Sequence, residues 1–118
     1  MHRVLLVLDS DDLSTILHKE FSSYCEVEIC DAAAAVDMID HYRPDALILD
    51  LFLPGTDGFQ ILQNMTYKAP SVILLTLLIS SDILLRAVDL NVDYIFLKPF
   101  KLLALATQLY KLLDVDPK

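Results

Sequence analysis

Five side chains that could bind a metal ion or a phosphoryl group each follow a short apolar run of this sequence. In chain order they are Asp9, Ser10, Asp50, Thr76 and Lys98. Carboxylate oxygens are the ligands that Mg²⁺ prefers, and an ammonium and a hydroxyl are donors to which phosphoryl oxygens form hydrogen bonds. If the fold brings these side chains together, they can hold a hard cation and a phosphoryl group at one place.

The apolar runs predict strands, and stretches with apolar residues at helical spacing lie between them. The predicted strands are residues 3–8, 25–30, 46–50, 71–75 and 94–97. The predicted helices are residues 13–21, 32–42, 59–65, 81–90 and 102–113, the first capped by Asp11 or Asp12 and the fourth by Ser81 and Asp82. This strict alternation predicts an α/β fold: a doubly wound, five-stranded parallel sheet with helices on both faces and right-handed crossovers.

Asp50 is the central residue of this arrangement. It directly follows the apolar residues 46–49, and residues 54–58 then supply the proline and glycines of a turn before the helix that begins at Phe59. In an open α/β sheet, ligands bind outside the carboxyl ends of the strands. All five candidate side chains follow strands, so we expect them at that one edge.

Composition and charge narrow the function classes. The chain has 118 residues, which suits one domain over residues 1–118, and a net charge of −8, which disfavours direct nucleic-acid binding. Although 55% of the residues are hydrophobic, the apolar runs are far shorter than the roughly 20 residues of a membrane helix. The first run is also too short for a secretory signal. We therefore expect a cytoplasmic protein without membrane contact.

The two cysteines predict neither a disulfide nor a metal site. Cys25 and Cys30 lie in or beside one predicted strand, five positions apart, so their side chains should face opposite ways. His2, His18 and His41 show no metal-ligand spacing with either cysteine. We expect both cysteines to be reduced.

Four motifs, each at the end of a predicted strand, resemble the receiver domain of two-component response regulators. They are Leu-Asp-Ser at residues 8–10, Ile-Leu-Asp-Leu-Phe-Leu-Pro-Gly-Thr-Asp-Gly at residues 48–58, Leu-Leu-Thr at residues 74–76 and Leu-Lys-Pro-Phe at residues 97–100. Residues 87–100 look especially like the receiver of the sporulation-initiation regulator. The resemblance covers essentially the whole chain and implies a flavodoxin-like (CheY-like) fold with strand order 2-1-3-4-5.

The resemblance implies that Asp50 is the phosphoacceptor, which takes a phosphoryl group from a sensor histidine kinase or a phosphotransfer protein. The Mg²⁺ ion of the family would then be held by Asp9, Asp50 and the backbone carbonyl of Phe52. Ser10 stands where the family usually has a second acid, and a hydroxyl is a poorer Mg²⁺ ligand than a carboxylate. The metal is therefore expected to bind weakly, unless Asp11 reaches the site.

The family also assigns roles to residues on the last two strands. Lys98 would pair with a phosphoryl oxygen, the Thr76 hydroxyl would move to bond another, and the Lys98–Pro99 peptide would be cis. Ile95 occupies the switch position that commonly carries an aromatic residue, and Leu77 a position that is usually alanine or glycine.

The departures from the family pattern leave alternative functions to be considered. Ser10 and Leu77 favour a degenerate receiver that binds proteins without being phosphorylated. A hydrolase of the haloacid-dehalogenase type would need a second acid two residues after its nucleophile, where this chain has Phe52. Flavin binding also suits the fold, but the acidic loop after the first strand would repel a flavin phosphate. We expect a signalling domain rather than an enzyme.

Apolar residues in the fourth predicted helix and its flanks exceed what one helix face can bury. Leu84, Leu85 and Tyr94 are the candidate interface residues, and Leu103 and Tyr110 lie off the core stripe of the last helix. In receivers this face, formed by the fourth helix, fifth strand and fifth helix, mediates dimerisation. We therefore expect a homodimer through this face.

Overall fold

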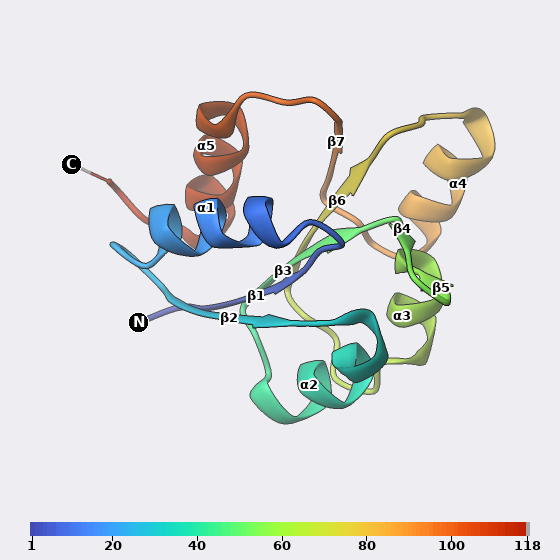
Figure 1. The fold of residues 1–118 in the computed structure, drawn as a ribbon, viewed down its shortest axis with the longest axis horizontal. Coiled ribbons are helices and arrows are strands. Elements are labelled where there is room, and N and C mark those ends of the chain that lie inside the picture. The colour runs from blue at the N-terminus through green and yellow to red at the C-terminus, as the bar shows by residue number, and fades with distance from the viewer. Residues whose placement is uncertain (118) are drawn as a thin grey trace.

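The computed structural model describes residues 1–117. It consists of a parallel sheet between two layers of helices (Figure 1). The strands are β1 (Arg3–Val7), β2 (Glu26–Cys30), β3 (Ala46–Asp50), β4 (Phe52–Leu53), β5 (Thr56–Asp57), β6 (Ser71–Thr76) and β7 (Tyr94–Leu97). The helices are α1 (Asp11–Phe21), the 3₁₀ turn η1 (Ala32–Ala34), α2 (Ala35–Tyr42), α3 (Gly58–Asn64), α4 (Ser81–Asp89) and α5 (Leu102–Leu113). The five long strands pair in parallel in the order β2-β1-β3-β6-β7. This confirms the predicted fold class and strand order.

Successive side chains of each strand point to opposite faces of the sheet, and this divides the core into two clusters. In β1, Val4 and Leu6 join the cluster under α1 and α5, whereas Leu5 and Val7 join the cluster under α2, α3 and α4 (Figure 1). Both faces of β1 and β3 are covered, so these strands carry continuous apolar runs. The central strands are thereby fixed, and with them the positions of the residues at their carboxyl ends.

The start of α1 differs from the prediction. Ser10, and neither Asp11 nor Asp12, is the N-cap: its backbone is extended, and its hydroxyl oxygen accepts a hydrogen bond from the Leu13 N–H at 3.1 Å. The two aspartates instead occupy the first helical turn, where negative charge interacts favourably with the helix dipole.

Ser80 caps α4, so the predicted caps Ser81 and Asp82 were wrong by one or two residues. The Ser80 hydroxyl accepts the Ile83 N–H at 3.2 Å. Ala87 is the single buried residue of α4, whereas α5 has five buried residues. Most apolar side chains of α4 therefore face outward, and α4 is held to the sheet by little side-chain burial.

Two further elements were not predicted. Strands β4 and β5 pair as a short antiparallel hairpin where a simple turn was expected, with Gly55 at φ +74° between them. A 3₁₀ turn precedes α2 where one continuous helix was expected.

Tyr110 was expected off the core stripe of α5, and this was wrong. Its side chain is 6% exposed and packs edge-to-face against the rings of Phe21 and Tyr24. Leu103, by contrast, is 78% exposed, as predicted. The apolar stripe of α5 is thus wider than helical spacing alone indicated, because the aromatic rings at the end of α1 extend the core.

The cysteines lie on opposite faces of the sheet, as predicted. Cys25 belongs to the cluster under α1 and α5, Cys30 packs against the other cluster, and both are free. Within residues 1–117, no helix is long and apolar enough to cross a bilayer.

Cys30 is expected to react slowly with alkylating agents. Burial, with a smaller contribution from the Asp31 carboxylate, raises the pKa of Cys30 to about 11. Because only the thiolate reacts, alkylation by iodoacetamide at pH 8 should be about 100-fold slower in the folded than in the urea-unfolded protein, and should accelerate as pH rises toward 11. Peptide mass spectrometry over time measures this rate, and equal rates in both states would contradict the prediction.

Candidate functional site

Asp50 is held at the carboxyl end of β3 with both carboxylate oxygens engaged. The residue is 1% exposed. Its Oδ1 lies 2.7 Å from the Lys98 Nζ, and its Oδ2 accepts a hydrogen bond from the Asp9 backbone N–H at 2.8 Å. A buried carboxylate is costly unless it is paired and hydrogen-bonded, and both conditions are met here.

Lys98 reaches Asp50 from the residue after β7. Its backbone N–H donates to the Thr76 carbonyl at 2.7 Å, which continues the pairing of β6 and β7, and its side chain is 22% exposed. The Lys98–Pro99 peptide is cis, as the resemblance implied. The predicted gathering of Asp9, Asp50 and Lys98 at one edge is therefore observed.

The hydroxyl of Thr76 bonds the backbone of the loop that follows β6. It donates to the Leu78 carbonyl at 2.8 Å and accepts the Leu78 N–H at 3.2 Å. Thr76 itself is 1% exposed at the end of β6. The residue is thus at the expected edge, but its hydroxyl is occupied by the loop that follows it.

Leu77 is exposed to solvent, whereas Ile95 is partly buried. Leu77 is 70% exposed and lines a surface hollow of about 510 Å³ together with Ser10 and Lys98. It therefore lies near Lys98, with most of its side chain in solvent. Ile95 is partly buried and packs against the cluster under α2, α3 and α4.

Gly58 is a residue of the site that the predictions missed. A Cβ atom at this position would lie 2.7 Å from the backbone carbonyl oxygen of Asp50 and 3.1 Å from the Leu74 Cδ1. Its N–H donates to the Leu51 carbonyl at 2.7 Å. The signal was present in the Asp-Gly pair that starts α3, because a glycine at a helix start often marks a close backbone approach.

The side chains of Asp9 and Asp50 supply carboxylate oxygens, which are the ligands that Mg²⁺ prefers. Asp9 lines a hollow of about 270 Å³ together with Asp11 and Asp31, and Mg²⁺ is commonly bound through one or two carboxylates and several waters. The Ser10 hydroxyl, predicted as a weak ligand, is engaged as the α1 cap. Residues 1–117 contain no group of three or more His, Cys, Asp or Glu side chains arranged to hold a metal. Asp9 and Asp50, with the Phe52 carbonyl, are therefore the donors that could hold the ion.

Fold and site together define a receiver, and the chain belongs to the response regulator receiver domain family, whose pattern matches residues 4–110. Receivers of this kind interact with histidine kinases or phosphotransfer proteins. Solved receivers share its fold. The signal receiver domain of a putative LuxO repressor from Vibrio parahaemolyticus is 28% identical, with a TM-score of 0.83 over 96% of this chain and 90% of that one. The receiver of HemR from Leptospira biflexa is 24% identical, with a TM-score of 0.86 over 100% and 98%.

A chemotaxis protein of Vibrio cholerae has the same fold, with 24% identity, a TM-score of 0.84, and coverage of 95% of this chain and 98% of that one. The comparisons therefore agree on the receiver fold across chains that share about a quarter of their residues.

Proposed function

We propose that this receiver takes a phosphoryl group from the phosphohistidine of a sensor histidine kinase or phosphotransfer protein onto Asp50. The observation that supports this most directly is the buried Asp50 carboxylate, 2.7 Å from the Lys98 ammonium at the ligand-binding edge of the sheet. A carboxylate oxygen forms the new O–P bond while the P–N bond to the donor imidazole breaks, and the imidazole nitrogen keeps the electron pair.

Lys98 and Thr76 act on the phosphoryl oxygens in this proposal. The Lys98 ammonium has three N–H donors, so it can bind a phosphoryl oxygen when Asp50 Oδ1 carries the phosphoryl group as an acyl phosphate. Rotation of the Thr76 hydroxyl away from the Leu78 carbonyl would offer a second donor. The exchange of these hydrogen bonds would carry the change from Asp50 to the loop before α4 and on to a partner protein.

Asp9, Asp50 and the Phe52 carbonyl would hold Mg²⁺ at this site. When bound, the ion offsets repulsion between the carboxylate and the phosphoryl oxygens. The Asp9 N–H holds Asp50 Oδ2 in place, which fixes the orientation of the carboxylate for in-line approach of a donor.

Asp50→Asn is expected to abolish phosphorylation. An amide nitrogen or oxygen cannot replace the carboxylate nucleophile, although the side chain keeps its size. Wild-type protein treated with acetyl phosphate and Mg²⁺ should give a shifted band on a Phos-tag gel and the mass of one added phosphoryl group, and the variant neither.

Asp89→Asn is the matched control, since Asp89 is an exposed acid in α4 away from the site. It should label like the wild type. Equal labelling of the Asp50→Asn variant would contradict the assignment of the phosphoacceptor. A wild-type chain that takes no label at high Mg²⁺ would favour the alternative, a degenerate receiver that binds partners without phosphorylation.

The degenerate alternative is supported by the Ser10 hydroxyl, which caps α1 and so leaves one fewer metal donor.

An enzyme of the dehalogenase type is not proposed, because Phe52 offers no general acid or base. A cytoplasmic location suits the two free cysteines, and the net charge of −8 disfavours nucleic-acid binding by this chain.

A homodimer through α4, β7 and α5 is proposed from the exposed apolar side chains there. Leu84, Leu85 and Tyr94 are 46%, 65% and 38% exposed. Burying them against a second copy would remove apolar area from water. Light scattering with beryllofluoride and Mg²⁺ should show a dimer that Leu85→Glu disrupts. A monomer at high concentration with and without beryllofluoride would contradict this proposal.

A further inference from the structure

Arg86 of α4 lies over an aromatic ring at the start of α3. Its guanidinium carbon is 4.8 Å from the centroid of the Phe59 ring, a distance at which a cation is attracted to the face of the ring. Phe59 is 3% exposed and belongs to the core cluster under α2, α3 and α4, so the ring is a fixed surface. The two helices lie side by side (Figure 1). The Arg86–Phe59 contact therefore joins α4 to the core through a side chain that is itself exposed.

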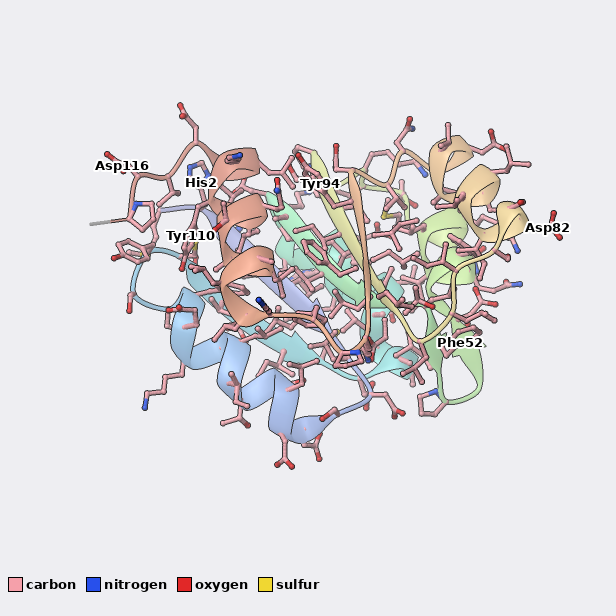
Figure 2. All side chains as sticks on the ribbon, turned by 90° about the horizontal axis from the view of Figure 1, so that it is seen from above. His2, Phe52, Asp82, Tyr94, Tyr110 and Asp116 are labelled. Atoms are coloured by element: carbon pink, nitrogen blue, oxygen red, sulfur yellow. The ribbon has the colours of Figure 1, made fainter. Side chains whose placement is uncertain are left out.

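Arg86 is not held in this position by a carboxylate. Asp82 stands four residues earlier on α4, where the side chains of a helix are neighbours. Within residues 1–117, however, no ion pair within 4.0 Å includes Arg86. Asp82 lies instead at the outer edge of the molecule (Figure 2). The guanidinium can therefore leave the ring without breaking an ion pair.

Few other side chains attach α4 to the rest of the molecule. Apart from Ala87, which is buried, and Ile83, which is partly buried, every residue of α4 is exposed. A hollow of about 350 Å³ lies beside this helix, lined by residues that include Phe52, Phe59 and Ile83. Because core side chains do not fill this space, the Arg86–Phe59 contact is a large part of what holds α4 in place.

The contact also joins two segments that lead away from the edge of the sheet where Asp50 lies. Phe59 is the second residue of α3, which directly follows the β4–β5 hairpin after Asp50. Helix α4 directly follows the loop that occupies the Thr76 hydroxyl. A displacement of α4 is therefore opposed by the Arg86–Phe59 contact at one side and moves the Thr76 loop at the other.

We propose that the Arg86–Phe59 contact is regulatory: it holds α4 in its resting position and breaks whenever α4 leaves that position. A weaker contact then lets α4 leave more often, and the loop before α4 releases the Thr76 hydroxyl more often. A released hydroxyl can bind the incoming phosphoryl group, so the contact restrains the rate at which Asp50 is phosphorylated. This last step rests on the proposed function, whereas the movement of α4 does not.

Native-state amide exchange of the full chain, followed by NMR, tests the movement of α4 without any phosphoryl group. Arg86→Met keeps the aliphatic stem and removes the charge, so α4 should open locally about two- to fivefold more often and its amides should exchange faster by the same factor. Arg86→Lys keeps a cation and should exchange nearly like the wild type. A contact that breaks only on global unfolding would leave the local exchange of α4 unchanged, and that result would overturn the proposal.

Arg43→Met is the matched control. The Arg43 guanidinium carbon lies 5.4 Å from the centroid of the Tyr67 ring, and both residues lie outside α4. This variant loses a contact of the same kind at another place, so it should leave the amide exchange of α4 unchanged. Equal acceleration of α4 exchange by Arg43→Met and Arg86→Met would overturn the assignment of the effect to α4.

A double-mutant cycle identifies the ring as the partner of Arg86. Phe59→Leu removes the ring and keeps an apolar side chain, so Arg86→Met in this background should accelerate α4 exchange no further. Arg86 also lies in the last turn of α4, where a cation interacts favourably with the helix dipole. An equal effect of Arg86→Met with and without the ring would assign the effect to the dipole and overturn the proposal.

Labelling by acetyl phosphate and Mg²⁺ separates this proposal from the proposed function. Arg86→Met should raise the initial labelling rate about two- to fivefold, in step with the more frequent opening of α4. Faster exchange of α4 with an unchanged labelling rate would overturn the regulatory role of the contact. A wild-type chain that takes no label would contradict the proposed function, while the exchange measurement still decides whether the contact holds α4.

Discussion

Replacing Gly58 by alanine is expected to lower the free energy of unfolding by about 3 kcal/mol, because the added methyl group collides with the backbone. Its Cβ would lie 2.7 Å from the carbonyl oxygen of Asp50. That oxygen belongs to β3, the central strand of the sheet, so it cannot move as the end of a flexible side chain could. Urea unfolding followed by circular dichroism measures the loss.

Gly55→Ala is the matched control for this prediction. A Cβ at Gly55 would have no atom within 4 Å, but the backbone φ is +74°. Its cost should therefore be only the left-handed strain of a non-glycine residue, about 1 kcal/mol. If Gly58→Ala lowers the free energy of unfolding no more than Gly55→Ala does, the end of β3 tolerates displacement of the Asp50 carbonyl, and the prediction is wrong.

Movement of the Asp50 carbonyl also has a consequence for the proposed chemistry. The carboxylate of the same residue is fixed between the Lys98 ammonium and the Asp9 N–H. Gly58→Ala should therefore slow phosphorylation by acetyl phosphate even at low temperature, where the variant is still folded. Normal labelling of a folded but destabilised variant would separate the two effects.

Ser10→Asp is expected to tighten Mg²⁺ binding about tenfold, or about 1.4 kcal/mol. The substitution adds a carboxylate beside Asp9 at the edge where Asp50 lies, and carboxylates are stronger Mg²⁺ ligands than hydroxyls. Aspartate caps helices as well as serine does, so the start of α1 should be preserved. Calorimetric or NMR titration with Mg²⁺ measures the affinity.

Ser10→Asn is the control that separates charge from capping. Asparagine also caps helices well but carries no charge, so its Mg²⁺ affinity should stay near that of the wild type. An equal rise in Mg²⁺ affinity in both variants would mean that the conformation at the start of α1, and not the added charge, determines how tightly the ion binds. No tightening by either would mean that residue 10 faces away from the ion.

Much of the fold could be predicted from the sequence because its local patterns agree. Apolar runs such as residues 46–49 alternate strictly with helical spacing, and this fixes an α/β sheet. The helix starts were less certain, since Ser10 and Asp11 are both good caps. Only the extended backbone of Ser10 decides between them. Tyr110 was misplaced because its burial depends on aromatic rings that are distant in the sequence, at the end of α1 and in the turn after it.

The site was predicted in composition but not in detail. Asp50 and Lys98 could be placed together because both follow strands of one sheet. Asp9 contacts Asp50 through its backbone N–H, and side-chain types carry no information about such a bond. The Thr76 hydroxyl is held by a local loop contact, which strand positions alone could not indicate.

The sparse attachment of α4 has a consequence for fluctuations of the molecule. With Ala87 as its single buried residue, this helix should detach and re-form at a smaller cost than global unfolding. Its amide hydrogens would then exchange with solvent through these brief local openings, while those of β3 exchange only when the whole molecule unfolds. Regions of low local stability are those from which conformational switches are commonly drawn, and α4 directly follows the loop that holds the Thr76 hydroxyl.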